Sequence, residues 1–328
     1  MTGPWVVGVD IGGTNVVVGL VSTRGGRPLG LRTRATASLG PPQEVVSHIV
    51  RMVEEAMEEG LSEIGGSRDD VIGVGIGCPG PLDLERGIVL DAFNLGWRDL
   101  ALRDGLADAL GLPANLENDA NCATWGEFWM GAAREAQSLV GVTLGTGIGG
   151  GVVLGGQLVR GTSATAGELG HMTIDFTGRR CACGNYGCLE AYASGPNIAA
   201  RAREGLEAGA ESQLLEMVEG DLDRITAVTV YEALVQQDAY ALEVMLETAK
   251  ILGAGIANVV NVLNPEVIVI VGGVTRAGEH LFGPVRSEVR RRAFRTAERV
   301  CRIVPGDLPE TAGVIGAAGL FLEVTRSR

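Results

Sequence analysis

The sequence contains few cysteines and no long uninterrupted apolar segment. Six cysteines among 328 residues are too few for a disulfide framework, and the longest apolar runs fall short of the roughly 20 residues that cross a bilayer. The first residues also lack the basic leader and apolar stretch of a secretion signal. We therefore expect a cytoplasmic protein that folds by burying its apolar side chains.

Basic side chains are scarce relative to acidic ones. The chain has 27 Lys and Arg against 40 Asp and Glu, a formal net charge of −13, which repels phosphate backbones and anionic lipid surfaces. We expect neither a nucleic acid nor a membrane as a partner. Hydrophobic residues make up 46% and charged residues 20%, as in globular proteins, and the length suffices for about two domains.

Glycine is abundant, but its 50 copies show no period of three, which excludes a collagen-like chain. Residues 6–21 contain two β-branched runs joined by Gly12 and Gly13, the pattern of a β-hairpin. The same layout returns 133 residues later, where Val7, Gly8, Val9 and Gly12 recur as Val140, Gly141, Val142 and Gly145. This internal repeat predicts two similar α/β lobes.

The rest of the chain alternates between helical and strand-like patterns. Apolar residues at helical spacing predict helices over 44–59, 241–262 and 310–324, and continuous apolar runs predict buried strands over 71–77 and 266–271. No low-complexity linker separates these segments. We expect an α/β protein of two lobes, joined by short connections, with a cleft between them.

The two glycine-rich turns are candidate phosphate sites. Glycine lets backbone N–H groups converge on an anion because no Cβ obstructs the approach. Asp10 stands at the head of the first turn, where it would hold Mg²⁺ through water, and Thr14 and Thr146 would offer hydroxyls. Either turn taken alone is as typical of an ordinary hairpin, but the pair favours a polyphosphate clamp.

Residues 145–150 also match the G-x-G-x-x-G fingerprint of dinucleotide-binding proteins. That motif must open a helix whose N-terminus holds the pyrophosphate. The residues that follow, 151–156, are strand-like and interrupted by glycine. The sequence therefore disfavours a nicotinamide cofactor.

Four metal-binding side chains lie close together in the sequence: His171, Cys181, Cys183 and Cys188. Three thiolates and one imidazole suit tetrahedral zinc, and four protein ligands leave no open position, which predicts a structural metal. The alternative is a group of reduced free cysteines, because the spacing differs from the commonest zinc-finger patterns. A Cys181–Cys183 disulfide is disfavoured by its strained one-residue loop and by a reducing compartment.

Two glutamates belong to the same segment. Glu168 precedes His171 by three residues, and Glu190 follows Cys188 by two. A metal that fixes this loop would hold both carboxylates in place to accept charge-assisted hydrogen bonds from neutral hydroxyls. A polyol is the ligand that this arrangement suggests, and the alternative is a pair of ordinary surface glutamates.

Asp119 is the candidate general base. It stands at the start of a predicted helix that runs past Phe128, so that Asn118 or Asp119 could act only as a helix N-cap. The functional interpretation has Asp119 accept the proton of an attacking hydroxyl while Asn118 orients the substrate. The two roles are compatible, because a helix N-terminus keeps a carboxylate ionised.

Four motifs together resemble the ROK family (repressor, open reading frame, kinase), and most of all its bacterial ATP-dependent glucokinases. The resemblance covers essentially the whole chain, and its specific parts are residues 10–15, 117–121, 144–151 and 168–190. The last of these is long and carries the Cys-x-Cys and Gly-x-x-Gly-Cys-x-Glu elements of the family.

The resemblance implies the two-lobed actin/hexokinase-type ATPase fold with ribonuclease H-like lobes. A small lobe would comprise residues 1–117, joined by the C-terminal helix 310–328. The large lobe would comprise residues 118–309 and include the zinc-binding loop 168–190. The resemblance further implies a homodimer or homotetramer.

The resemblance also assigns roles to individual residues. His171, Cys181, Cys183 and Cys188 would bind zinc, and Asp119 would be the base. Sugar hydroxyls would meet Asn118, Asp119, Glu168, His171 and Glu190, with Asn94 and Gly80 at the edge of the sugar site. The nucleotide and its magnesium would be bound by Asp10, Gly12, Gly13, Thr14, Asn15, Thr146 and Gly147, with Gly272 and Gly273 near adenosine.

The implied reaction is transfer of the γ-phosphoryl group of MgATP to a hexose, with D-glucose converted to glucose 6-phosphate. Kinases for N-acetylmannosamine, N-acetylglucosamine, mannose or fructose remain alternatives, because no quoted residue reads the substituent at carbon 2. A non-catalytic sugar-sensing protein is a third. Repressors of the family carry a DNA-binding domain ahead of the first turn, whereas nine residues precede Asp10 here, so we do not expect a repressor.

Overall fold

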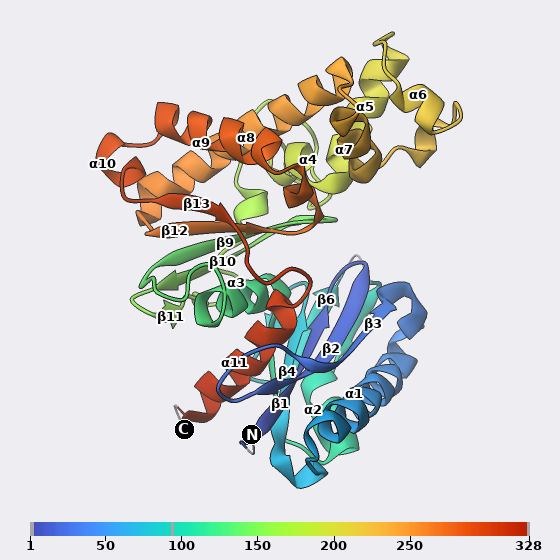
Figure 1. Ribbon diagram of the computed structural model, residues 1–328, viewed down its shortest axis with the longest axis vertical. Helices are drawn as coiled ribbons and strands as arrows, with labels where there is room; N and C mark the ends of the chain where they lie inside the picture. The colour runs from blue at the N-terminus through green and yellow to red at the C-terminus, as the bar shows by residue number, and fades with distance from the viewer. Residues whose placement is uncertain (1–2, 93–94, 327–328) are drawn as a thin grey trace. The chain divides into compact units, whose positions relative to one another are not determined.

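The computed structural model describes residues 3–92 and 95–326 and is shown in Figure 1. The chain forms two compact units. Unit 1 comprises residues 1–141, 151–167 and 306–328, and unit 2 comprises residues 142–150 and 168–305. Asn94, expected at the edge of the sugar site, lies outside the described residues.

A five-stranded sheet forms the centre of unit 1, with the strand order β3-β2-β1-β4-β8. The strands are β1 (Trp5–Ile11), β2 (Asn15–Ser22), β3 (Leu29–Ala35), β4 (Val71–Cys78) and β8 (Ala114–Asn118). The expected hairpin and buried strand are confirmed: β1 pairs antiparallel with β2 and parallel with β4. A smaller sheet of unit 1 contains β5 (Leu82–Asp83), β6 (Ile88–Ala92) and β7 (Trp97–Leu100).

Helices cover both faces of the first sheet because β1 is apolar on both. Val7, Val9 and Ile11 pack in one core with the apolar side of α1 (Pro42–Ile64), and α2 (Leu102–Leu110) joins the same core. Val6 points to the other face and packs against α11 (Ala312–Arg326), which in turn packs against α3 (Asp119–Trp129). Figure 1 shows α1 and α11 on opposite sides of this sheet.

The second sheet repeats the layout of the first. Its order is β11-β10-β9-β12-β13, so β9 occupies the central place that β1 has in the first sheet. The strands are β9 (Leu139–Leu144), β10 (Ile148–Leu154), β11 (Gln157–Leu158), β12 (Val267–Val271) and β13 (Arg302–Pro305). The sequence repeat of the two hairpins is thus a repeat of topology.

Seven α-helices of unit 2 are described, and α8 is the longest. They are α4 (Glu190–Ala193), α5 (Gly195–Glu207), α6 (Leu214–Met217), α7 (Ala227–Val235), α8 (Ala239–Leu263), α9 (Glu279–Arg292) and α10 (Arg295–Glu298). Within the described ranges, α8 alone is long and apolar enough to cross a membrane, but half of its most apolar window is buried. It packs against α7 and α9, as a core helix does.

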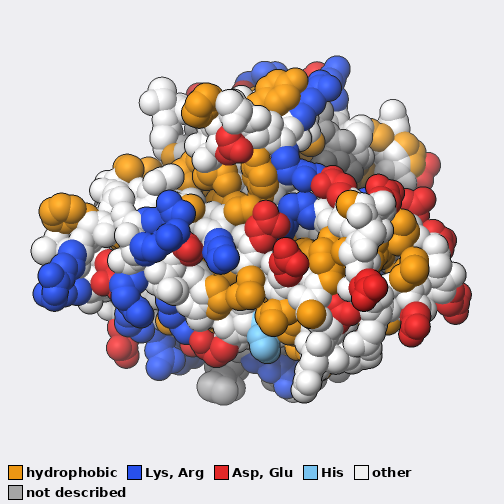
Figure 2. All heavy atoms as spheres, turned by 90° about the horizontal axis from the view of Figure 1, so that it is seen from above, with side chains coloured by type: hydrophobic (Ala, Val, Ile, Leu, Met, Phe, Trp, Pro, Cys, Tyr) orange, Lys and Arg blue, Asp and Glu red, His pale blue; other side chains and the backbone are white. Residues whose placement is uncertain are grey.

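Charge is unevenly distributed on unit 2. Figure 2 shows Lys and Arg side chains gathered toward the end formed by α9 and α10, and Asp and Glu side chains predominating toward the end formed by α5 to α7. Part of the basic group is neutralised locally, because Arg291 and Arg292 both pair with Glu288 at 2.9 and 2.8 Å. Exposed pairs of this kind contribute little to stability.

The two compact units are a different division of the chain from the two expected lobes, which stay a prediction. The expected lobe boundary lies between residues 117 and 118, whereas unit 1 extends to residue 141. The reason is that α3, directly after that boundary, packs against the C-terminal helix α11, which belongs to unit 1 as well.

Candidate functional site

The carboxyl ends of three parallel strands bring the first group of candidate residues together in unit 1. In the parallel registers Asp10 of β1 pairs with Gly77 of β4, and Cys78 of β4 pairs with Asn118 of β8. The carboxyl edge of such a sheet is where open α/β folds bind their ligands. Asp10, Asn118 and the adjoining Asp119 therefore share one sheet edge.

Asn118 and Asp119 form the start of α3. The Asn118 side chain is the N-cap, since its Oδ1 accepts a hydrogen bond from the Asn121 backbone N–H at 3.1 Å. Asp119 Oδ1 accepts from the Ala120 N–H at 2.9 Å. Both side chains are half-buried. The capping interpretation of Asn118 is confirmed, and its amide Nδ2 has no partner among the described residues.

Asp10 carries an electrostatic penalty. Burial first, and then the negative charge of Asp119, together raise the pKa of its carboxyl to about 7. The α11 backbone comes so close that a Cβ on Gly313 would lie 2.1 Å from Asp10 Oδ2. A divalent cation bound to this oxygen-rich edge would relieve the repulsion between the carboxylates, so the donor set fits magnesium.

The first glycine-rich turn connects β1 and β2 in unit 1. The Gly12 N–H donates a hydrogen bond to the Asn15 carbonyl at 2.8 Å. The Thr36 hydroxyl, outside the turn, donates to the Gly12 carbonyl at 2.8 Å. Gly13, Thr14 and Asn15 are exposed, so their backbone is accessible to an anion. Gly80 lies in the turn after β4, where its φ of 94° is left-handed.

The second glycine-rich turn belongs to unit 2. Its Gly145 N–H donates to the Gly147 carbonyl at 3.0 Å, and Gly145 and Thr146 are exposed. The strand β10 follows this turn directly, so the helix required by a dinucleotide fingerprint is absent, as expected. Gly272 and Gly273 directly follow β12. Gly272 lies so close to the end of β9 that a Cβ on it would be 2.2 Å from the Leu144 carbonyl oxygen.

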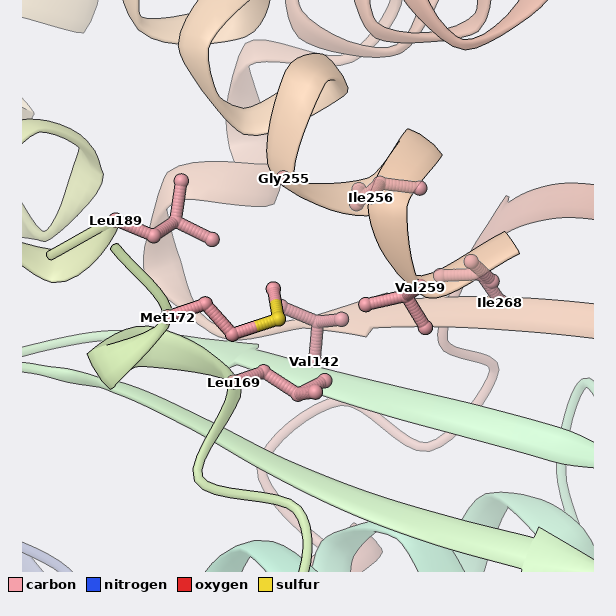
Figure 3. Close-up of a pocket in the computed structure, with 8 residues that line it drawn as sticks. All are labelled: Val142, Leu169, Met172, Leu189, Gly255, Ile256, Val259 and Ile268. Carbon is pink, nitrogen blue, oxygen red and sulfur yellow. The ribbon is translucent and has the colours of Figure 1, made fainter. Parts of the chain in front are cut away.

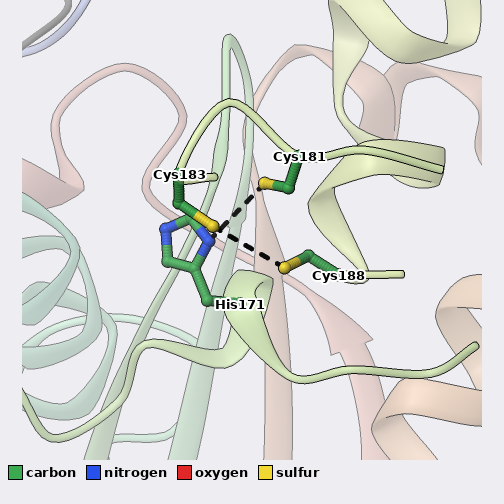
Figure 4. A group of neighbouring side chains, drawn as sticks. All are labelled: His171, Cys181, Cys183 and Cys188. Carbon is green, nitrogen blue, oxygen red and sulfur yellow. Dashed lines mark hydrogen bonds between the residues drawn. The ribbon is translucent and has the colours of Figure 1, made fainter. Parts of the chain in front are cut away.

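The predicted metal ligands converge in unit 2. Their ligand atoms all lie within 4.8 Å of one another, and they are His171, Cys181, Cys183 and Cys188. Figure 4 shows the four side chains pointing toward a common centre. Cys183 Sγ lies 3.8 Å from Cys188 Sγ, and Cys181 Sγ lies 3.8 Å from His171 Nδ1. A zinc ion with bonds of about 2.3 Å to sulfur places tetrahedral ligands roughly 3.8 Å apart, so the arrangement fits zinc.

Backbone turns hold the cysteines in this arrangement. The Cys181 N–H donates to the Asn185 carbonyl at 2.8 Å, and the Gly184 N–H donates to the Cys181 carbonyl at 3.0 Å. Burial raises the pKa of the Cys181 thiol to about 12. A bound cation opposes that shift because it stabilises the thiolate. We call residues 168–190 the zinc loop.

The two glutamates of the zinc loop lie on either side of its metal ligands. His171 turns Nδ1 toward the thiols, and its Nε2 lies 3.9 Å from Glu168 Oε2. Glu190 Oε1 lies 3.7 Å from Cys181 Sγ, while its Oε2 accepts a hydrogen bond from the Ile148 N–H at 2.8 Å. Glu168, His171, Glu190 and the second turn are therefore one connected group within unit 2.

An apolar core anchors the zinc loop to the rest of unit 2. Leu169, Met172 and Leu189 of the loop face Val142, Gly255, Ile256, Val259 and Ile268 around a residual cavity of about 10 Å³, shown in Figure 3. The cavity has no polar lining and holds at most one water-sized sphere, so it does not bind a ligand. Its significance is mechanical: the loop packs firmly on α8 and the second sheet.

Glu117 is a further buried charge to which the sequence analysis gave no role. Its side chain is 2% exposed and pairs with Arg160, whose Nε donates to Oε2 at 2.6 Å. Its Oε1 accepts from the Asn118 N–H and from Asn121 Nδ2, each at 3.0 Å. Glu117 thereby holds the strand end that carries Asn118 and Asp119. The only signal in the sequence is a charged residue at the end of a buried strand.

Comparisons with known proteins agree over nearly the whole chain. The profile of the ROK family matches residues 6–324. The glucokinase of Halalkalibacterium halodurans is 38% identical over 334 residues, which cover 100% of this chain and 98% of that protein. A putative xylose repressor of Caldicellulosiruptor sp. is 32% identical, over 97% of this chain and 78% of the repressor.

A solved structure agrees as closely. The ROK family glucokinase from Streptomyces griseus, in complex with glucose and AMPPNP, superposes with a TM-score of 0.83 at 36% identity, covering 96% of this chain and 98% of that one. This similarity confirms the expected fold class, the two-lobed α/β fold of these sugar kinases.

Replacement of the half-buried Asp10 should stabilise the ligand-free protein in a pH-dependent way. Because the folded pKa is about 7 and the usual value is 3.8, folding takes up a proton between these pH values and the wild type loses stability as the pH rises through that window. Asp10→Asn removes the titration. Its advantage in urea unfolding should grow from pH 4 to pH 7 toward about 4 kcal/mol. A difference independent of pH would contradict the assignment, and Asp108→Asn, at an exposed position, is the control.

The zinc loop should bind about one zinc ion per chain, measured by elemental analysis after purification and dialysis. Cys183→Ser removes one of the four ligands and should lower the bound zinc sharply, because closed structural sites need all four. The matched control is Cys301→Ser, a free thiol outside the cluster, which should keep the full complement. Equal zinc in both variants would exclude the site.

Proposed function

The chain belongs to the ROK family, and we propose that it is an ATP-dependent kinase that converts D-glucose to glucose 6-phosphate. Its glucokinase relatives and the similar solved kinase support a sugar kinase. The observation that carries the proposal is the placement of Asp119 at the start of α3, on the same sheet edge as Asp10 and the first glycine-rich turn. A base, a cation-binding carboxylate and a phosphate cradle are the parts that phosphoryl transfer to an alcohol requires.

Asp119 acts as the general base in this proposal. It accepts the proton of the attacking primary hydroxyl, a role typically worth about 10²–10⁴ in rate. Its bond from the Ala120 N–H, in the first turn of α3, holds the carboxylate in a fixed orientation. Asn118 is fixed by its capping bond and directs its free amide Nδ2 toward the sugar.

Each glycine-rich turn is a phosphate-binding candidate within its own unit. Gly13 and Thr14 of the first turn, and Thr146 of the second, are exposed residues whose backbone an anion can approach. Magnesium, bound with ATP as part of the substrate, neutralises charge on the transferring group. Asp10 receives that cation, and Gly272 and Gly273 adjoin the second turn on the adenosine side.

The sugar is held by the zinc loop. Glu168, His171 and Glu190 present acceptors that recognise neutral hydroxyls through charge-assisted bonds. Zinc on the thiols and His171 Nδ1 supplies folding free energy to the loop and takes no part in the chemistry. The other imidazole nitrogen, Nε2, then faces the carbohydrate, as its position beside Glu168 supports.

A second candidate is a sugar-binding protein without catalysis, which the similarity to a putative xylose repressor favours. Such a protein would keep the sugar-binding residues and release no ADP. The retained Asp119, Asp10 and both glycine-rich turns support the kinase instead, because a sensor of sugar alone has no use for a base or a phosphate cradle.

A panel of sugars in a coupled ADP assay tests the proposal. Glucose should give the highest kcat/KM among glucose, mannose, fructose, N-acetylglucosamine and N-acetylmannosamine, each assayed with and without ATP. A higher value with an acetamido sugar would replace glucose as substrate while leaving the kinase intact. Sugar-dependent thermal stabilisation with no ADP from any sugar would instead identify the non-catalytic protein.

Asp119→Asn should abolish turnover while leaving binding nearly unchanged. The amide keeps the shape and the bond from the Ala120 N–H but accepts no proton, so kcat should fall by about 10²-fold or more. Calorimetric affinities for glucose and for a non-hydrolysable ATP analogue should stay within a few fold. Substantial retained kcat would remove Asp119 from the role of base.

A further inference from the structure

We infer that Glu190 is a positioning residue for the nucleotide-binding turn, so that the zinc loop organises the ATP side of the site as well as the sugar side. This inference rests on the proposed function, because it assigns ATP to the second glycine-rich turn. It adds to that function a mechanical link between three parts of unit 2: the metal ligands, a sugar-binding carboxylate and the phosphate cradle.

The link is a single hydrogen bond between segments that are distant in sequence. The Ile148 N–H donates to Glu190 Oε2 at 2.8 Å across 42 residues. Ile148 itself is 2% exposed, so water does not compete readily for this N–H. A carboxylate acceptor makes the bond roughly twice as strong as one between neutral groups. The start of β10 is therefore held by the zinc loop.

Gly147 shows how closely the two groups approach. A Cβ at this position would lie 2.6 Å from Glu190 Oε2, a separation that carbon and oxygen do not tolerate without displacement. The carboxylate therefore occupies the space that a side chain at residue 147 would fill. A side chain at residue 147 would have to displace the Glu190 carboxylate.

A second contact fastens the same turn. The Gly195 N–H, at the start of α5, donates to the Gly145 carbonyl at 2.9 Å. Asn197 stabilises residues 190–195, because its Nδ2 donates to the Glu190 carbonyl at 2.9 Å and to Ser194 Oγ at 2.7 Å. The turn is thus bound at Gly145 and at Ile148 by one short, internally braced segment.

That segment continues directly from the metal ligands. Glu190 is the first residue of α4 and follows Cys188 by two positions, and the Ala191 N–H donates to the Cys188 carbonyl at 3.0 Å. The Leu189 N–H donates to the Met172 carbonyl at 2.9 Å. This bond joins the segment to the residue that follows His171. A cation that orders the four ligands must therefore restrict Glu190.

Two consequences follow for binding. ATP affinity depends on Glu190 although Glu190 contacts no phosphate, and it depends on occupancy of the zinc site. Because the proposed function also assigns Glu190 to the sugar, sugar and nucleotide are coupled through one side chain, and that coupling is reciprocal by linkage. Glu168, which lies 3.9 Å from His171 Nε2, is assigned to the sugar in the proposed function.

The decisive experiment is calorimetric titration of the zinc-loaded full chain with a non-hydrolysable ATP analogue and Mg²⁺, without sugar. Glu190→Ala should weaken binding at least about tenfold, the usual consequence of removing a hydrogen bond to a charged group. Glu190→Gln keeps an oxygen that can accept from Ile148 and should weaken it less. The matched control Glu168→Gln should weaken glucose binding but leave nucleotide affinity within about twofold of the wild type.

Hydrogen exchange supplies a readout that is independent of nucleotide. The Ile148 amide should exchange faster in Glu190→Ala than in the wild type, and faster in wild-type protein stripped of metal than in loaded protein. If Glu190→Ala is unstable, the exchange rate of the Ile148 amide is measured in Glu190→Gln and in the metal-stripped wild type instead.

The outcomes separate the two proposals. Equal nucleotide affinity in the wild type and Glu190→Ala, or an Ile148 amide indifferent to Glu190 and to metal, would overturn the positioning role. A wild type that binds no ATP analogue but protects the Ile148 amide through Glu190 would instead overturn the kinase assignment while keeping the structural link.

Discussion

Two carboxylates, those of Asp10 and Asp119, share one edge of the first sheet, and their mutual repulsion is the constraint that the chemistry of unit 1 must satisfy. Burial and the charge of Asp119 together raise the pKa of Asp10 to about 7. Such an arrangement is unfavourable in the empty protein and becomes favourable when a cation arrives. Active sites commonly contain such electrostatic repulsion, because a cation that relieves it is bound more tightly.

Unit 2 meets a different requirement, which is to hold a long irregular loop in a fixed shape. The zinc loop contains only one short 3₁₀ helix, Leu169–His171, and the first residue of α4. Apolar contacts beneath it, from Leu169, Met172 and Leu189, anchor one side, and the converging cysteines provide a second anchor on the other. With both in place, a carboxylate such as Glu190 can be directed at a backbone N–H with the accuracy that recognition needs.

Much of the fold followed from local patterns. The hairpin of residues 6–21 and the long helix around 241–262 were predictable, because β-branched runs and apolar spacing report directly on local backbone preference. The convergence of His171 with Cys181, Cys183 and Cys188 was predictable from residue type and proximity in the chain. The position of α3 within unit 1 was not, because it depends on packing against α11, almost two hundred residues later, and neither helix carries a local signal of its partner.

The sequence by itself determined the class of the protein and the repeated topology, and it indicated the candidate groups for phosphate, sugar and metal, because residue chemistry and short-range spacing specify these. Only the tertiary structure decided how those groups act on one another: that Glu117 is buried against Arg160, that Asp10 lies near a second negative charge, and that Glu190 accepts from Ile148. These relations arise where distant segments meet in a medium of low polarity, and there the strength of a charge or a hydrogen bond depends on its neighbours in space.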